Sequence, residues 1–180
     1  TGKARVFEYM TVGLGSIGCL FVQLLKRAGA SVVGVDPLGD RADLAKRLGA
    51  DAAGPRESAK AWVSELSGDR GADVFVVTGG GADVLPLAAE LTRDGGAIHY
   101  FAGGGGDRLP LPLETLYHRE LTVTATYSSS PATLAEAFRL IVDGDVSVEG
   151  LITHRLPLER LAEGVDLMRR HEALKVYVTP

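Results

Sequence analysis

Apolar and polar positions alternate along the chain in a pattern that predicts strands and helices in turn. Short apolar runs are bounded by glycine, aspartate or proline, and between them apolar residues recur every three or four positions, as on one face of a helix. The predicted strands are residues 6–13, 31–36, 73–78, 96–102, 121–127, 151–156 and 175–179. The predicted helices are residues 17–28, 40–48, 58–66, 82–92, 113–120, 130–143 and 158–170. The alternation predicts an α/β fold, with a doubly wound parallel sheet in three layers, α/β/α.

Residue types that are favoured at the starts and ends of helices mark the limits of several predicted helices. The carboxylate of Asp40 is placed to cap one helix, and Gly49 fits the left-handed residue at its end. Ser130 followed by Pro131 combines a hydroxyl cap with proline at the first helical position, and Gly144 ends that helix.

The pattern changes character near residue 150, where we expect a domain boundary. Residues 1–150 carry the long alternation and form the main domain, and residues 151–180 form a small C-terminal appendage of strand, helix and strand. A chain of 180 residues has room for both, because single domains typically span roughly 100–200 residues.

Composition and charge narrow the classes of partner. The formal net charge is -4, and the 19 lysines and arginines are scattered rather than gathered in a basic stripe, which argues against a nucleic-acid partner. Apolar runs stay short of the roughly 18–20 residues that span a bilayer, and residues 1–5 lack the apolar core of a signal peptide. We therefore expect no membrane partner and a cytoplasmic location.

A glycine-rich segment joins the first predicted strand to the first predicted helix, which predicts a Rossmann-type dinucleotide-binding fold. Gly13 permits the tight turn, Gly15 lets the backbone approach a pyrophosphate, and Gly18 lets helix and strand pack closely. The helix start presents free amides at the positive end of the helix dipole. The predicted phosphate-binding residues are Gly13, Leu14, Gly15, Ser16, Ile17 and Gly18.

Asp36 ends the second predicted strand, where an acidic residue of this fold accepts hydrogen bonds from the adenosine ribose. It favours NAD over NADP, because a 2′-phosphate beside a carboxylate meets like-charge repulsion. Arg41 leaves several interpretations open: it pairs with Asp36, contacts the ribose, admits some NADP, or is a solvated helix residue.

Two further strand ends are candidate contacts, because ligands of open parallel sheets bind beyond the carboxyl edge of the strands. Thr78 and Gly79 are expected to border the adenosine and ribose. Phe101, Ala102 and Gly103 are expected to lie beside the nicotinamide, although glycines at both places also fit ordinary turns.

The chain carries no evident catalytic apparatus. No tyrosine is followed four residues later by lysine, and the sequence contains neither a serine nucleophile elbow nor a Walker-type lysine. The four histidines show no ligand spacing, so a catalytic or metal-binding role is not expected for them. Cys19, the only cysteine, is expected to pack as a small apolar residue, and Trp62 to anchor its helix.

The chain resembles the cofactor-binding half of the medium-chain, zinc-dependent alcohol and polyol dehydrogenases, and its YSSSP segment is similar to the sorbitol and threonine dehydrogenase branch. The resembling stretches are VGLGSIG at 12–18, GVD at 34–36, AKRLGAD at 45–51, GG at 95–96, YSSSP at 127–131 and KVYV at 175–178. The resemblance implies hydride transfer between a nicotinamide and an alcohol or polyol held on zinc, which acts as Lewis acid. It also implies that residues 13–18 form the phosphate loop, Asp36 the ribose acceptor beside Arg41, Thr78 an adenosine-side contact and residues 101–103 the nicotinamide wall.

In that family a barrel-like catalytic domain comes first and carries the zinc ligands, and residues 1–12 of this chain cannot replace it. The resemblance therefore implies a chain that binds NAD, or NADP, but is inactive alone, with zinc in the missing domain. It implies that residues from about 151 resemble the return into that domain. Rossmann sheets of the family also associate edge to edge, so residues 121–127 are expected to present the edge of a homo-oligomer.

Two alternatives remain open. A non-catalytic nucleotide-binding or oligomerisation module uses the same fold, since fold does not imply function. A methyltransferase that uses S-adenosylmethionine has a similar glycine loop and strand-end acid, but Gly18 fits a pyrophosphate-binding loop better.

Overall fold

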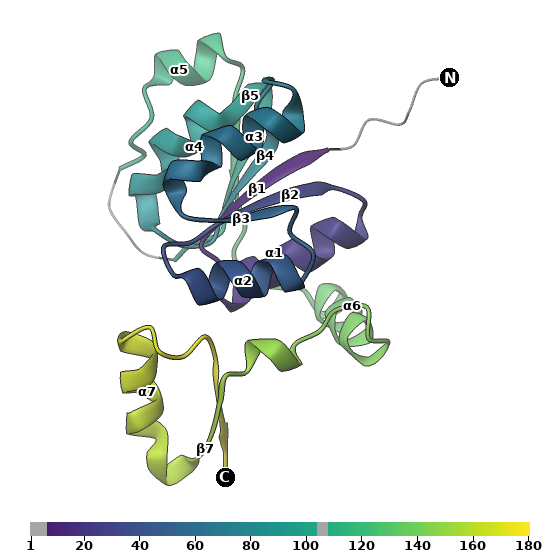
Figure 1. Cartoon of the computed structure of the whole chain (residues 1–180), viewed down its shortest axis with the longest axis vertical. Helices are drawn as coiled ribbons and strands as arrows, with labels where there is room; N and C mark the ends of the chain where they lie inside the picture. The colour runs from purple at the N-terminus through teal and green to yellow at the C-terminus, as the bar shows by residue number, and fades with distance from the viewer. Residues whose placement is uncertain (1–6, 104–107) are drawn as a thin grey trace. The chain divides into compact units, whose positions relative to one another are not determined.

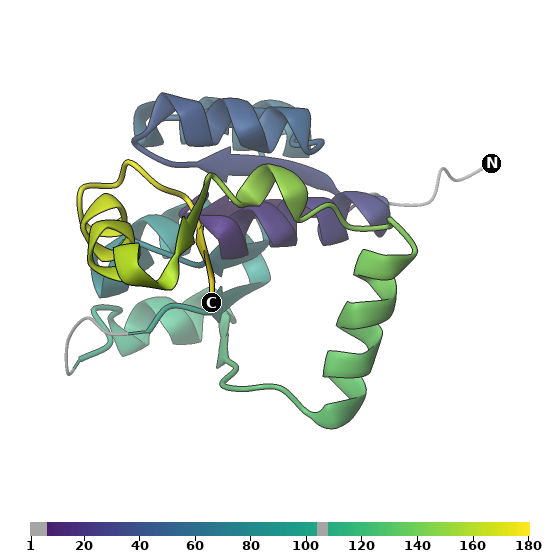
Figure 2. The same cartoon turned by 90° about the horizontal axis from the view of Figure 1, so that it is seen from below.

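The computed structural model describes residues 7–103 and 108–180. The chain forms two compact units, Thr1–Ser129 and Ser130–Pro180, each with a sheet of its own (Figures 1 and 2). The sequence pattern predicted a boundary after residue 150, whereas the compact units divide at Ser129–Ser130. The helix predicted at 130–143 thus belongs with the C-terminal unit, where the Val146 N–H donates back to the Leu140 carbonyl (3.1 Å) and Val146 is buried.

The first unit is built on a six-stranded sheet in the order β3-β2-β1-β4-β5-β6, with every neighbouring pair parallel. Its strands are β1 (Glu8–Val12), β2 (Ser31–Val35), β3 (Ala52–Gly54), β4 (Ala72–Val77), β5 (Thr92–Tyr100) and β6 (Thr122–Ala125). This order confirms the predicted doubly wound parallel sheet. The short strand β3 was not predicted, because three small residues carry no alternation and no β-branched side chain.

Helices cover both faces of this sheet (Figure 1). One face carries α1 (Ser16–Arg27) and α2 (Gly39–Arg47), and the other carries α3 (Ala59–Ser67), α4 (Leu85–Leu91) and α5 (Leu113–His118). Short 3-10 turns, Arg56–Ser58 and Gly81–Val84, lead into α3 and α4. The three predicted layers are therefore present.

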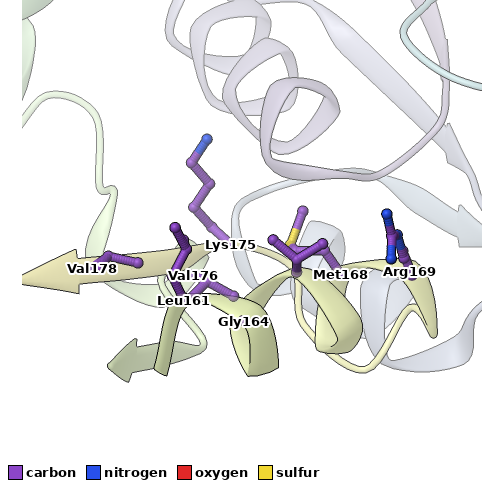
Figure 3. A pocket seen from close by; sticks show the side chains of 8 residues that line it. Leu161, Gly164, Met168, Arg169, Lys175, Val176 and Val178 are labelled. Atoms are coloured by element: carbon purple, nitrogen blue, oxygen red, sulfur yellow. The ribbon is translucent and has the colours of Figure 1, made fainter. Parts of the chain in front are cut away.

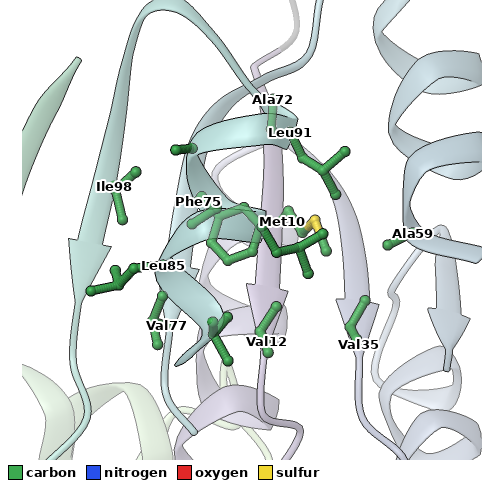
Figure 4. Close-up of a cluster of buried hydrophobic side chains, with 14 of the residues drawn as sticks. Met10, Val12, Val35, Ala59, Ala72, Phe75, Val77, Leu85, Leu91 and Ile98 are labelled. Atoms are coloured by element: carbon green, nitrogen blue, oxygen red, sulfur yellow. The ribbon is translucent and has the colours of Figure 1, made fainter. Parts of the chain in front are cut away.

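The main hydrophobic core lies between the sheet and the layer of α3, α4 and α5 (Figure 4). Met10, Phe75 and Ile98, from three neighbouring strands, are fully buried there, and Leu85 and Leu91 of α4 close over them. Fully burying a side chain of this size contributes about 1.5–3 kcal/mol, so this cluster holds the strands in place.

Of two side chains predicted to cap helices, one does so and the other does not. Asp40 does not cap α2: the helix begins at Gly39, and the Leu38 N–H at its start donates to the carboxylate of Asp36 (3.0 Å). Asp40 instead lies in the first turn, where its charge still favours the helix dipole. Ser130 does cap α6 (Pro131–Val142), and its side chain accepts a hydrogen bond from the Thr133 N–H (3.2 Å).

A buried carboxylate joins three neighbouring strands, β1, β4 and β5, at the edge of the sheet opposite the glycine-rich segment. Asp73 is 2% exposed, and its carboxylate accepts hydrogen bonds from the Glu8 N–H (2.9 Å) and from Arg93 Nε (2.6 Å). Burial raises the pKa of the Glu8 carboxyl and Asp73 raises it further, while Arg70 at 2.8 Å lowers it. These bonds connect β1, β4 and β5 at the edge of the sheet opposite the site.

The second unit contains a two-stranded parallel sheet and two α-helices. Its elements are α6 (Pro131–Val142), a 3-10 turn Glu149–Leu151, β7 (His154–Pro157), a 3-10 turn Leu158–Arg160, α7 (Leu161–Arg169) and β8 (Val176–Thr179). Helix α7 packs closely against β8 at Gly164. A Cβ built on this glycine would lie 3.0 Å from Val176 Cγ1, so a larger residue there would crowd the strand.

An apolar groove of about 390 Å³ lies between α7 and β8 (Figure 3). Three side chains that line it remain 40–47% exposed: Leu161, Val165 and Met168. The complete lining is Leu161, Gly164, Val165, Met168, Arg169, Lys175, Val176 and Val178.

Candidate functional site

Several of the residues singled out by the sequence lie together at the carboxyl edge of the six-stranded sheet. Because β1, β2, β4 and β5 are parallel, the residues that follow them meet at one edge. The segment 13–15 follows β1, Asp36 follows β2, Thr78 and Gly79 follow β4, and residues 101–103 follow β5. The structure thus assembles four loops that are far apart in sequence.

Two glycines of the first loop allow close backbone contacts that any side chain would block. Gly13 has φ +92°, and a Cβ built on it would lie 2.6 Å from the Gly79 nitrogen. A Cβ on Gly18 would lie 1.9 Å from the carbonyl oxygen of Gly13. Gly13 therefore makes the tight turn, and Gly18 lets α1 pack against the loop, as the sequence predicted.

Gly15 differs, because nothing in the described chain lies within 4 Å of the Cβ that it lacks. It precedes α1, whose first helical bond runs from the Cys19 N–H to the Gly15 carbonyl (2.9 Å), so the amides of Ser16, Ile17 and Gly18 face out of the helix end. Within the described residues, no side chain caps this end and no acidic residue lies in its first turn. The open space and the free amides suit a phosphate group.

Leu14 serves the site through its backbone. Its side chain is fully buried and lies over Gly34 of β2, where a Cβ would come within 2.9 Å of Leu14 Cδ2. Its N–H donates to the carboxylate of Asp36 (2.8 Å). The glycine loop is therefore attached directly to the acidic residue at the end of the neighbouring strand.

Asp36 is 4% exposed and holds two loops at once. Besides the Leu14 N–H, its carboxylate accepts a hydrogen bond from the Leu38 N–H (3.0 Å). Arg41 Nη1 lies 3.6 Å from Asp36 Oδ2, so of the interpretations left open for Arg41 the structure shows the pairing with Asp36. An ionised carboxylate has about four acceptor positions, so these contacts do not use all the acceptor capacity of Asp36.

Thr78 contacts the glycine loop. Its hydroxyl lies 3.0 Å from the Val12 carbonyl oxygen and 2.5 Å from that of Gly13, and its N–H donates to Val12 (2.9 Å). The hydroxyl proton is thus directed at the loop backbone. The contact with an adenosine that the sequence predicted stays a prediction.

Residues 101–103 alternate between the two faces of the sheet. Ala102 packs against the main core together with Tyr100, whereas Phe101 is 37% exposed and its ring contacts Phe21 of α1. Gly103 is exposed. Of the three predicted wall residues, Phe101 therefore presents the largest accessible surface.

Cys19 packs on the inner face of α1, as expected for a small apolar residue. Burial, with a smaller contribution from the charge of Asp36, raises the pKa of the Cys19 thiol to about 11. The thiol is therefore neutral at physiological pH and unsuited to act as a nucleophile.

Sequence reasoning missed Gly79 as the close neighbour of Gly13, and it missed the contacts of His99. His99 lies 3.0 Å from Thr124 Oγ1 and stacks on Phe101. No local signal marks the Gly13–Gly79 and His99–Thr124 pairs, because their members are 25 or more residues apart. His99 and Phe101 are two residues apart, a spacing that puts them on one face of an extended segment and that could have been read from the sequence.

In the described parts of the chain no three His, Cys, Asp or Glu side chains are gathered as metal ligands would be. The described residues thus form no zinc site of their own, and the resemblance implies zinc in the catalytic domain rather than among them. None of the helices described here is both long and apolar enough to cross a membrane.

Comparison with known proteins identifies the family. The family described as zinc-binding dehydrogenase matches residues 16–143, which include α1, Asp36 and all strands of the large sheet except β1. The chain belongs to this zinc-binding dehydrogenase family. This confirms the resemblance seen in the sequence.

Individual relatives agree with the assignment. This zinc-binding dehydrogenase chain is 47% identical to D-guloside 3-dehydrogenase of Escherichia coli K12 over 104 residues, which are 56% of this chain and 30% of that protein. It is 27% identical to L-threonine 3-dehydrogenase of Bacillus licheniformis, covering all of this chain and 53% of that protein. The alcohol dehydrogenase structure from Thermus sp. ATN1 matches with a TM-score of 0.86 and 27% identity, over 96% of this chain and 51% of that one.

The chain thus spans about half the length, or less, of the relatives that it matches. The same matches identify it as the Rossmann-like, NAD(P)-binding part of the zinc-type medium-chain dehydrogenase family. They do not favour the methyltransferase or the purely non-catalytic module.

Proposed function

We propose that this chain holds NAD for a dehydrogenase that transfers hydride between the cofactor and an alcohol or polyol. The observation that carries the proposal is the packing of Gly13 against Gly79 and of Gly18 against Gly13, beside an open Gly15 at the start of α1. This cradle has room for a pyrophosphate only because its three glycines lack Cβ atoms.

Different residues of the chain would bind different parts of the cofactor. The amides of Ser16 and Ile17 would bind the pyrophosphate, and Asp36 would accept hydrogen bonds from the adenosine ribose. Thr78 would keep the loop in its binding shape through Gly13. Residues 101–103, at the end of β5, would lie beside the nicotinamide.

The preference for NAD over NADP is part of the proposal. A 2′-phosphate would approach the buried carboxylate of Asp36, and two negative charges at that distance repel each other. Arg41, 3.6 Å from Asp36, offsets some of that repulsion, so weak binding of NADP is expected.

NAD supplies the chemistry when it is bound, because its nicotinamide ring accepts hydride from the alcohol carbon and returns it in the reverse direction. The chain's own residues bind and orient it. We propose that catalysis needs residues outside this chain, since the described residues offer no metal-binding cluster and no activated nucleophile. An alcohol or polyol substrate is proposed from the relatives' names, which include threonine and sorbitol dehydrogenases.

NADH titration of this chain tests the proposal directly. Trp62 is the only tryptophan, and its ring lies against Gly54 at the carboxyl end of β3. The Gly54 carbonyl accepts a hydrogen bond from the Asp36 N–H, so Trp62 lies near the proposed ribose site. Energy transfer from Trp62 to bound NADH would therefore report binding. We expect saturable NADH binding, displacement by ADP-ribose, and at least tenfold weaker binding of NADPH because of the like-charge contact at Asp36.

S-adenosylmethionine is the matched control ligand, and it should not displace NADH. Tighter binding of S-adenosylmethionine than of NADH would contradict the proposal and favour a methyltransferase. Saturable NADH binding without alcohol turnover, in a longer protein that includes a catalytic domain, would favour the non-catalytic module.

We also propose that the chain associates with a second copy through β6. This strand is one of the two edge strands of the six-stranded sheet, and Thr122, Thr124 and Ala125 on it are exposed. Edge strands offer unpaired backbone groups to another strand. Sedimentation velocity over a range of concentrations should show a dimer, and a monodisperse monomer at high concentration would contradict this.

The role of residues 151–180 is likewise a proposal. The exposed apolar groove between α7 and β8 supports packing against a catalytic domain, as the resemblance implied.

A cytoplasmic location is also part of the proposed function, and the single free, buried thiol of Cys19 is compatible with it.

A further inference from the structure

Three rings meet on the face of the sheet that α1 covers, just below its carboxyl edge. His99 of β5 and Phe101 share this face because they are two residues apart, and Phe21 comes from α1. The ring centroids of Phe21 and Phe101 are 5.6 Å apart with an interplanar angle of 73°, and those of His99 and Phe101 are 6.1 Å apart at 27°. Phe21 also lies 6.4 Å from His99, so each ring contacts the other two.

Both nitrogens of His99 have hydroxyl partners from β6 and its extension. Nδ1 lies 3.0 Å from Thr124 Oγ1, and Nε2 lies 3.2 Å from Thr126 Oγ1. A neutral imidazole donates from one nitrogen and accepts at the other, and a threonine hydroxyl can do either, so both contacts are satisfied in either tautomer. The sheet register pairs His99 with Thr124, so the backbone itself aligns the first hydroxyl. The imidazole is therefore held in position.

Phe101 is itself held in place by its backbone and by the two neighbouring rings. Its N–H donates to the Val77 carbonyl (2.8 Å), and its ring is bounded by His99 and Phe21. The remaining 37% of its surface is exposed beyond the end of β5. The ring is thus fixed on two sides and open on another.

The position of this ring in the sheet decides which half of a dinucleotide it can meet. Strand β5 is two strands from β1, which places its end about 10 Å from the glycine loop, since neighbouring strands are about 4.8 Å apart. Asp36 lies on the opposite side of β1. The ADP-ribose half belongs to the glycine loop and Asp36, and the nicotinamide half therefore extends toward Phe101.

We propose that His99 is a positioning residue of the cofactor site, held by Thr124 and Thr126 so that it fixes the Phe101 ring as a wall for the nicotinamide half of NAD. This inference rests on the proposed function. His99 does not contact the cofactor in this arrangement and acts through Phe101.

Comparison of NADH with ADP-ribose tests the proposal, because ADP-ribose lacks the nicotinamide. In His99→Ala, NADH affinity should fall about threefold to tenfold, the size of a lost aromatic contact, while ADP-ribose affinity stays within about twofold. His99→Phe keeps a ring against Phe101 without the hydroxyl partners, so its NADH affinity should lie between those of wild type and His99→Ala. The changed ratio of the two affinities is a readout that a purely stabilising role would not alter.

Thr122→Val is the matched control, because Thr122 lies on the same strand but pairs with Ala97. It should bind both ligands as wild type does, whereas the double variant Thr124→Val, Thr126→Val should lose NADH affinity selectively. Valine keeps the β-branched shape on this exposed strand, so the double variant gives the answer even if His99→Ala does not fold.

Equal losses for NADH and ADP-ribose, or no loss for either, would overturn the role of His99. Failure of the wild-type chain to bind either ligand would instead overturn the proposed function, and the inference with it. The two failures are therefore distinguishable.

Discussion

Gly18→Ala should both destabilise the chain and abolish tight NADH binding. The added Cβ would lie 1.9 Å from the Gly13 oxygen, far inside van der Waals contact, and 3.1 Å from Thr78 Oγ1, slightly closer than contact. Gly13 cannot move away freely, because its N–H donates to Val35 (2.8 Å) and its oxygen accepts from Thr78. Alanine gains about 1 kcal/mol in helix propensity over glycine, but overpacking against fixed backbone costs more, so we expect a net loss of about 2–4 kcal/mol.

Gly15→Ala is the comparison that separates folding from binding. Nothing in the described chain lies within 4 Å of its added Cβ, and its φ of -69° suits alanine, so stability should fall by at most about 1 kcal/mol. The methyl group would nevertheless occupy the space proposed for the pyrophosphate, and NADH affinity should fall at least tenfold. Chemical denaturation and NADH titration measure the two effects. Wild-type stability in Gly18→Ala, or wild-type affinity in Gly15→Ala, would contradict this account.

Asp36→Ala should weaken both the fold and the binding of NADH. It removes the acceptor of the Leu14 and Leu38 N–H groups and leaves Arg41 without the carboxylate beside it. A buried donor without an acceptor costs about 1–3 kcal/mol, so a loss of about 2–4 kcal/mol in unfolding free energy is expected. NADH should bind at least tenfold more weakly, and the discrimination against NADPH should relax because the repelling charge is gone.

Asp43→Ala is the control for this experiment. Asp43 also lies on α2, but it is exposed and makes only a surface ion pair with Lys46 (3.2 Å), so its removal should change stability by less than about 1 kcal/mol and leave NADH binding intact. Thermal denaturation and titration with both cofactors distinguish the variants. An Asp36→Ala chain that still prefers NADH as wild type does would show that another residue sets the preference.

Much of the fold could be predicted from the sequence because its signals are local. The periods of two and about 3.6 residues are set by neighbours along the chain, and they located the strands of the large sheet except β3. The VGLGSIG segment and Asp36 were recognisable for the same reason, since a tight turn, a helix start and a strand end are read within a few residues. Short helices such as α5 were also anticipated, with ends shifted by one or two residues.

Other features depended on residues that are distant along the chain. Strand β3 exists because Ala52–Gly54 pairs with β2 and Trp62 lies over Gly54, and neither contact leaves a local pattern. The hydroxyl of Thr78 donates to the carbonyls of Val12 and Gly13, which lie about 65 residues earlier, so this contact also leaves no local pattern.

By itself the sequence determined the order of the elements, the glycine loop and the acid at the end of β2. The tertiary structure decided what those residues touch: the attachment of Leu14 to Asp36, the contact of Gly13 with Gly79, and the placement of His99 between Thr124 and Phe101. The physical reason is that periodicity and turn chemistry act through adjacent residues, whereas buried hydrogen bonds and ring contacts are made by whichever side chains the parallel sheet brings to the same edge.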